Sequence, residues 1–300
     1  MVTDVLERTS TKKDLPLEVY LFLLDRKLTN CSPQTLVTYE RRLRVFLQFA
    51  NKPPKDILKQ DIQLYLLSLQ NKNRSPHYIK GCHLNLKVFF KWMVKDHIIA
   101  VSPMQDMDMP KVPKRIKPCL PRDAFDRLLA ACPNDFRGAR NAAWLWLFWT
   151  TGCRIGGLHN LRLSDLDWKR SWIKVTEKGD RDRFVPFTPD TQKAVHRYLK
   201  ARLVYMRGED PYEELWISEE RRPLTYYGIM MINRKLAQRA GLDFQDKHHI
   251  FRRSWLVRNL EAGVSLKTLQ LVGGWRDLAS LEIYARSMQS MTAVKSTQWH

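Results

Sequence analysis

Residues 136–151 encode a helix that is apolar on almost every side, because its centre reads AAWLWLFW. Such a helix has to be surrounded by other elements, so the chain must build a core around it. Arg154 follows the helix after only Gly152 and Cys153. A guanidinium in that setting is either paired with an acid or turned toward an anionic ligand. The sequence therefore predicts a buried salt bridge or an anion site directly after its most apolar helix.

A second group of polar residues lies between His249 and Tyr284. His249 and Arg252 are three positions apart, so both project from one face of a helix. A glycine pair at 273–274 interrupts the helical pattern before Trp275, and an amphipathic run then ends at Tyr284. Taken singly, each of these residues is explained as well by packing in a core. Together they place several hydrogen-bond donors and one hydroxyl on a helical support.

The pattern H-x-x-R, then Gly-Trp, then Tyr nine residues later resembles the tyrosine recombinase (phage integrase) family. The string T-G-C-R-I, followed by L-H-N-L-R-L-S-D-L-D, is similar to the family's first arginine motif. The string E-K-G-D-R-D-R-F-V-P-F is similar to its β-hairpin lysine loop. The resemblance covers roughly residues 14–290. It implies six catalytic residues, with the tyrosine as nucleophile: Arg154, Lys178, His249, Arg252, Trp275 and Tyr284.

Two positions depart from the family pattern. Gly157 stands where the family usually carries an acidic residue, three places after its first arginine. In the family that acid holds the active-site groups in place, so its absence leaves open how this site is braced and how active the enzyme is. Arg253 stands where many members have His or Lys. It can donate hydrogen bonds to a phosphate, but it cannot titrate near neutral pH.

The charge of the chain favours a polyanionic partner. With 51 basic and 31 acidic residues, the net charge is +20, which points first to nucleic acid and second to an anionic membrane surface. Residues 1–115 hold 20 basic and 11 acidic residues, and residues 116–300 hold 31 and 20. Both halves could therefore grip one duplex as a clamp. Residues 1–14 lack the apolar core that a signal peptide has, and no apolar run reaches the length of about 20 residues that a membrane span needs.

Nothing in the sequence calls for a cofactor or a metal. The chain has no Walker A loop and no H-E-x-x-H motif, and the chemistry implied by the resemblance needs no divalent ion. Its five cysteines are odd in number and widely spaced, which argues against a disulfide framework and a zinc site. We expect reduced, packed thiols in a cytoplasmic protein associated with the nucleoid.

The expected fold is mainly α with a small β-hairpin or sheet. Four helices are predicted at 15–28, 33–50, 57–69 and 76–97, similar to the family's SAM-like core-binding domain, here residues 14–109. A basic, proline-rich linker follows at 110–120, and then an α+β catalytic domain at 121–290. This domain is expected to hold helices at 121–132, 136–151, 189–207, 224–240 and 249–263, a hairpin of 171–176 with 183–187, and a short strand at 214–217. Residues 1–13 and 291–300 are tails.

Basic residues on the helices, linker and hairpin are the candidate DNA contacts. Any one of them could simply be solvated, but the collective excess suits phosphate neutralisation. They are Arg41, Arg44, Lys80, Lys87, Lys114, Arg115, Arg181, Arg183 and Arg253.

The resemblance implies a compact, Xer-like site-specific recombinase. Such an enzyme cleaves and rejoins double-stranded DNA through a 3′-phosphotyrosyl intermediate and exchanges strands through a Holliday junction, in integration, excision or resolution. A monomer in solution and a tetramer on DNA are expected, with an accessory DNA-bending protein or partner recombinase. Two alternatives stay open: a type IB topoisomerase-like enzyme, and a catalytically silent DNA-binding relative.

Overall fold

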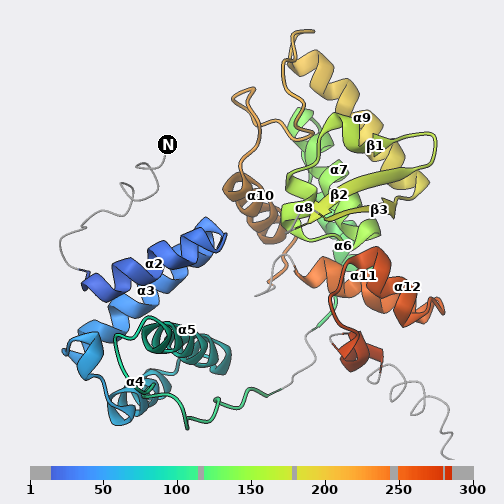
Figure 1. The fold of residues 1–300 in the computed structure, drawn as a ribbon. Helices are drawn as coiled ribbons and strands as arrows, with labels where there is room; N and C mark the ends of the chain where they lie inside the picture. The colour runs from blue at the N-terminus through green and yellow to red at the C-terminus, as the bar shows by residue number, and fades with distance from the viewer. Residues whose placement is uncertain (1–14, 114–117, 178–180, 244–248, 280, 286–300) are drawn as a thin grey trace, which may run out of the picture. The chain divides into compact units, whose positions relative to one another are not determined.

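The computed structural model describes residues 15–113, 118–177, 181–243, 249–279 and 281–285 (Figure 1). The chain divides into two compact units, residues 1–115 and 116–300. The described part is mostly helical and holds one three-stranded antiparallel sheet in the order β1-β2-β3, which confirms the predicted fold class. Each helix of the described part is too short or too polar to span a lipid bilayer.

The N-terminal unit contains the four predicted helices. They are α2 (Leu17–Leu28), α3 (Pro33–Ala50), α4 (Lys59–Asn71) and α5 (Pro76–Lys95), with a 3₁₀ turn, η1 (Pro54–Asp56), before α4. Ser32 and Ser75 cap α3 and α5, and each hydroxyl accepts a hydrogen bond from a backbone N–H of the first turn. A proline follows each cap, where its missing N–H costs nothing. Local sequence signals therefore set both helix starts.

Aromatic rings fill the core of this unit. The ring of Phe22 packs edge-on against Tyr39 and Phe89, and Phe46 packs edge-on against Tyr65. His83 on α5 is also fully buried, and neither of its ring nitrogens has a hydrogen-bond partner. Burial lowers the pKa of this imidazole, because the charged form would lose its hydration.

Helix α7 (Phe136–Thr151) is the centre of the C-terminal unit, as its sequence predicted. Eleven of its sixteen residues are buried. It packs against α6 (Arg122–Ala130), α9 (Pro189–Tyr205) and α11 (His249–Glu261). The remaining helices of the described part are α8 (Ile155–His159), α10 (Tyr226–Arg239) and α12 (Leu266–Gly273). The short helix α8 was not predicted.

The sheet confirms the predicted hairpin and adds a short strand. β2 (Trp172–Glu177) pairs with β3 (Arg181–Pro186), and Val175 lies opposite Arg183. The added strand is β1 (Leu166–Asp167), which pairs with β2 after a 3₁₀ turn, η2 (Leu163–Asp165).

The predicted strand at 214–217 is wrong. In this segment the described residues make only single bridges, Arg162 with Glu214 and Ile217 with Pro223. Side chains from α9 form hydrogen bonds with backbone groups of the segment. The Arg202 guanidinium donates to the Glu214 and Leu215 carbonyls, and the Tyr198 hydroxyl bonds to both Leu215 and Ile217. Residues 215–217 are buried because they pack on a helix, and a segment packed in this way has the same apolar pattern as a buried strand.

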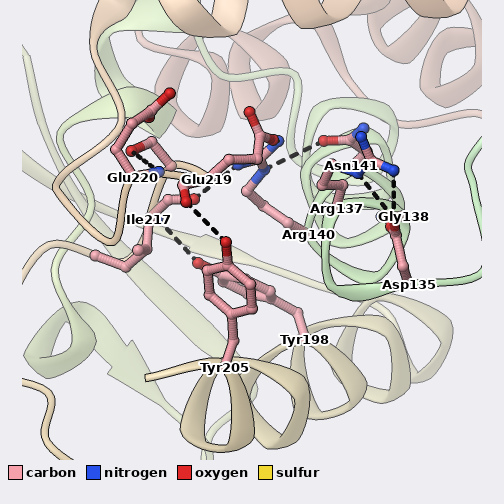
Figure 2. A network of polar contacts seen from close by, with 11 residues as sticks. Asp135, Arg137, Gly138, Arg140, Asn141, Tyr198, Tyr205, Ile217, Glu219 and Glu220 are labelled. Atoms are coloured by element: carbon pink, nitrogen blue, oxygen red, sulfur yellow. Dashed lines mark hydrogen bonds and ion pairs between the residues drawn. The ribbon is translucent and has the colours of Figure 1, made fainter. Parts of the chain in front are cut away.

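A buried arginine fastens the far end of α7 to the same segment (Figure 2). Arg140 is 2% exposed, and its guanidinium donates to the Ile217 carbonyl at 2.8 Å and to the Glu219 carboxylate at 2.7 Å. Tyr205 donates to the Glu219 carbonyl at 2.7 Å. Asp135 caps the start of α7 by accepting from the Gly138 N–H. This network is structural, because it pairs its cation with an acid.

Candidate functional site

A pocket of about 840 Å³ opens between α8, α10, α11 and the loop after α12. Its basic lining residues are Arg154, His249, Arg252 and Arg276. Among the described residues that line it, none is acidic. The pocket therefore presents cationic donors from segments more than 90 positions apart, which suits an anionic ligand. Its described lining residues are Cys153, Arg154, Ile155, Gly156, Gly157, Asn160, Thr176, Tyr226, His249, Arg252, Gly274 and Arg276.

Arg154 reaches the pocket because the chain turns sharply at Gly152. This glycine ends α7 with a φ of 59°, in the left-handed region that side chains disfavour. A Cβ there would also lie 2.5 Å from the Trp255 ring, so both backbone and space require glycine. Arg154 then occupies the position before the first residue of α8, and its Nη2 donates to the Gly274 carbonyl at 3.0 Å.

Arg252 is held rigidly on α11. It is 4% exposed, and its Nη1 donates to the Gly152 carbonyl at 2.8 Å. Its guanidinium carbon lies 3.5 Å from the centre of the Trp275 ring, within the range of a cation–π contact. His249, one turn earlier on α11, is exposed and lines the same pocket. The structure thus brings Arg154, His249 and Arg252 together, as the sequence predicted.

Trp275 and Tyr284 pack against apolar side chains. Both contact a small apolar cluster that joins α11 to α12 and contains Trp255 and Leu281. The Trp275 and Trp255 rings stack with centroids 6.2 Å apart. Residues 281–285 are helical, and Tyr284 is half-buried there. Neither Trp275 nor Tyr284 is among the described lining residues of the pocket.

The other predicted catalytic residue, Lys178, lies outside the described residues. The predicted DNA contacts Lys114 and Arg115 also lie outside them, as does the side chain of Arg181. The loop that would carry Lys178 joins β2 to β3, and Thr176 of β2 lines the pocket. The end of β2 therefore lies at the pocket wall.

The predicted DNA contacts of the N-terminal unit differ in exposure. Arg41 and Lys87 are exposed, and Lys80 is half-buried. Arg44 forms an ion pair with Glu40 on the same helix, with 2.8 Å between Nη2 and Oε1. Their contacts with DNA stay predictions.

Arg183 and Arg253, also predicted as DNA contacts, make internal hydrogen bonds. Arg183 donates to the Val272 carbonyl and, at 3.5 Å, to the Cys153 sulfur. Arg253 is 8% exposed and donates to the Pro118 carbonyl at 3.2 Å. Sequence alone could not separate these two from solvated arginines, because their partners lie 30 to 135 positions away.

At Gly157 the structure explains why a side chain is missing. A Cβ at this position would lie 2.7 Å from Cγ1 of Val175, a buried residue of β2. Valine therefore fills the space that the family's acidic side chain would have to enter. Arg154 and Arg252 donate instead to the backbone carbonyls of Gly274 and Gly152.

Sequence reasoning missed four polar lining residues: Asn160, Thr176, Tyr226 and Arg276. Arg276 carried a signal, since it directly follows Trp275. Asn160 lies in the string L-H-N-L-R that follows the first arginine, and Thr176 lies in the predicted hairpin, whereas Tyr226 carried no signal. His159 joins the helices of Asn160 and Tyr226, because its ring contacts Asn160 at 2.6 Å and the Leu224 carbonyl at 2.9 Å.

The thiol at the pocket wall is not suited to nucleophilic chemistry. Cys153 is 1% exposed, and burial raises the pKa of its thiol. The neutral thiol is a poor nucleophile. No group of three or more His, Cys, Asp or Glu in the described part of the chain could hold a metal ion.

Two family models match the chain. The phage integrase family model matches residues 118–291, and the phage integrase N-terminal SAM-like domain model matches residues 21–100. Tyrosine recombinase XerC of Anoxybacillus flavithermus is 26% identical over 264 residues, which cover 85% of this chain and 87% of the relative. Tyrosine recombinase XerD of Oceanobacillus iheyensis is 27% identical over 259 residues, which cover 84% and 87%.

A solved structure shares the fold. The XerH site-specific recombinase bound to a palindromic difH substrate superimposes with a TM-score of 0.74 at 18% identity. The similarity covers 90% of this chain and 82% of that one. Together with the family models, it confirms the predicted combination of a SAM-like helical domain and an α+β catalytic domain.

Proposed function

Because the chain belongs to the phage integrase family, we propose that its pocket holds one DNA phosphodiester while Tyr284 attacks the phosphorus. The protein is a tyrosine recombinase, an enzyme that breaks and rejoins DNA strands in site-specific recombination. The observation that carries the proposal is the meeting of Arg154, His249 and Arg252 in one cationic pocket.

The residue types fit the charge of the reaction. A phosphodiester carries one negative charge, and its pentavalent transition state carries about two, so donors that tighten on the transition state speed the reaction. The guanidiniums of Arg154 and Arg252 can each bind two phosphoryl oxygens. His249 supplies one further donor from the same pocket. The Trp275 indole is a fourth, once DNA is bound.

In the proposed cleavage step, the Tyr284 oxygen bonds to phosphorus and the bond to the 5′ oxygen breaks. The tyrosine proton passes to a base, for which His249 is the candidate, and Lys178 gives a proton to the departing 5′ oxygen. The 3′-phosphotyrosyl bond conserves the energy of the phosphodiester. A second strand's 5′ hydroxyl then reverses the step, and two such exchanges pass through a Holliday junction.

Tyr284 has to move toward the pocket, or reach a neighbouring protomer's pocket, because in the described structure it packs on the α11–α12 cluster. DNA binding would supply that rearrangement. This requirement distinguishes the tyrosine from Arg154 and Arg252, which line the pocket.

Double-stranded DNA is the proposed partner. Both units are basic, with net charges of +9 and +11, so both can neutralise phosphates of one duplex. We propose a monomer in solution and a tetramer on paired sites, with a partner recombinase or a DNA-bending protein as accessory. The place of action would be the nucleoid, in the cytoplasm.

The direct test is trapping of a covalent adduct on a nicked suicide duplex taken from DNA that flanks the gene. Wild-type protein should form the adduct, and Tyr284→Phe should not. Tyr20→Phe, which alters an exposed tyrosine of α2, is the matched control and should react normally. Tight DNA binding with no adduct from wild-type protein would leave a catalytically silent DNA-binding protein. Relaxation of a supercoiled plasmid that lacks any recombination site would instead indicate a topoisomerase.

A further inference from the structure

Arg183 projects from the inner face of the β2–β3 hairpin. Its register partner is Val175, which is 1% exposed, and the neighbouring inward residue Val185 is fully buried. An arginine that served only to be solvated would be expected on the opposite face, where Phe184 is 58% exposed. The alternation of the strand therefore directs this cation toward the interior of the unit.

The guanidinium joins two segments that are far apart in the sequence. Nη1 donates to the Val272 carbonyl, in the last turn of α12, and Nη2 donates to the Cys153 sulfur at 3.5 Å. The first segment runs directly into Trp275, and the second directly into Arg154. A carbonyl in the last helical turn has no partner within its own helix, so a cationic donor there satisfies it and matches the helix dipole.

Arg154 joins the same two segments, and Arg252 joins the second of them to α11. Arg154 donates to the Gly274 carbonyl at 3.0 Å, and Arg252 donates to the Gly152 carbonyl at 2.8 Å. Arg183 thus completes a set of contacts in which residues 152–154 and 272–274 are held together through arginine side chains. It differs from the other two because it belongs to the hairpin and is not a described lining residue of the pocket.

We propose that Arg183 is a positioning residue for strand cleavage. It holds the segment of Arg154 and the segment of Trp275 in register with the β2–β3 hairpin. This role rests on the proposed function of the pocket. Because Val175 leaves no room for an acidic side chain at position 157, the arginines of the site are held by hydrogen bonds to backbone carbonyls. Arg183 supplies the hydrogen bond of this kind that comes from the sheet.

The proposal replaces the simpler interpretation of Arg183 as a DNA contact, and the two make opposite predictions. A phosphate contact contributes to affinity and adds about 0.9 to the slope of log affinity against log salt. A positioning residue leaves the affinity unchanged and changes the rate of the chemical step, since a misplacement of about 1 Å can cost on the order of 10²-fold in rate.

The experiment compares Arg183→Met with Arg170→Met, which removes the same charge from the exposed turn between β1 and β2. Arg170 is 66% exposed and pairs only at the surface with Asp167. Affinity for the suicide duplex is measured at several salt concentrations, and adduct formation is then followed in a single turnover at saturating protein. We expect Arg183→Met to form the adduct about 10²-fold more slowly. Its affinity and salt slope should equal those of Arg170→Met, which should react at the wild-type rate.

Arg183→Lys keeps the charge and one donor, so it should recover part of the rate. If thermal unfolding shows that the methionine variant does not fold, the rate and affinity of the lysine variant test the proposal in its place. A lower affinity and a shallower salt slope with a normal rate at saturation would overturn the proposal in favour of a DNA contact. A folded Arg183→Met protein with unchanged rate and affinity would overturn it as well. If wild-type protein formed no adduct, the proposed function would fail, independently of Arg183.

Discussion

A methyl group at position 157 should destabilise the C-terminal unit, whereas the same methyl at position 156 should stabilise it. Both glycines lie in the first turn of α8, and neither has a positive φ. A Cβ at Gly156 would meet nothing within 4 Å, but a Cβ at Gly157 would lie 2.7 Å from Cγ1 of Val175. The two positions thus differ in the room that is left for a side chain, and both have ordinary helical backbone geometry.

The magnitude follows from two opposing terms. Replacing glycine by alanine in a helix stabilises by about 0.5–1 kcal/mol, and this is the whole expected effect of Gly156→Ala. Gly157→Ala gains the same amount but also overpacks the wall of β2, which costs about 1–3 kcal/mol. The two variants should therefore differ by about 1–3 kcal/mol, and each kcal/mol shifts the Tm of a unit this size by about 2–4 °C.

Urea unfolding followed by tryptophan fluorescence measures this difference, since Trp92 is the only tryptophan in residues 1–115 and the signal comes mainly from the C-terminal unit. A Val175→Ala background provides the internal control. That change removes buried methyls and should cost about 1.5–3 kcal/mol alone. In that background, Gly157→Ala should lose its penalty, because its methyl enters the vacated space.

Equal stabilisation by Gly156→Ala and Gly157→Ala in the wild-type background would refute this reasoning. It would mean that the β2 wall yields without cost, and that the missing acid at position 157 does not reflect a lack of room. A penalty at Gly157 that persists unchanged in the Val175→Ala background would refute it too, since the clash would then lie elsewhere.

Three further outcomes are expected. Burial lowers the pKa of His83 below its ordinary 6.5, so the unfolded chain takes up a proton at a higher pH than the folded chain does. The free energy of unfolding should therefore be highest above pH 6.5 and fall as the pH drops below that value. His83→Phe should remove this pH dependence in thermal unfolding of the N-terminal unit. Arg140→Met should lower the free energy of unfolding in urea by about 1–3 kcal/mol, because the buried Ile217 carbonyl loses its donor. Glu219→Gln should lower it by less than about 1 kcal/mol, since that carboxylate is 48% exposed. Arg252→Lys should slow adduct formation by about 10²–10³-fold, because lysine cannot fork onto two oxygens; a change of less than tenfold in single-turnover assays would count against its role.

Local sequence signals were sufficient for most of the helices. The caps at Ser32 and Ser75, the prolines after them and the apolar run of α7 act within a few residues, so their effects are readable without the fold. The chemistry of the pocket was readable for a similar reason. His249 and Arg252 share a helix face through local geometry alone, and Arg154 follows a helix that had to be buried.

Tertiary structure decided everything that depends on distant partners. The segment 214–217 is apolar like a strand, yet it is held by side chains of α9 and forms no ladder. Arg183 and Arg253 were predicted as DNA contacts from residue type alone, but carbonyls of α12 and of the linker end accept their hydrogen bonds. The lack of a side chain at Gly157 is explained only by Val175 of β2, which fills the space that a side chain there would need. Residue type and spacing specify which donors a chain can offer, but packing determines whether each one faces a ligand or another part of the protein.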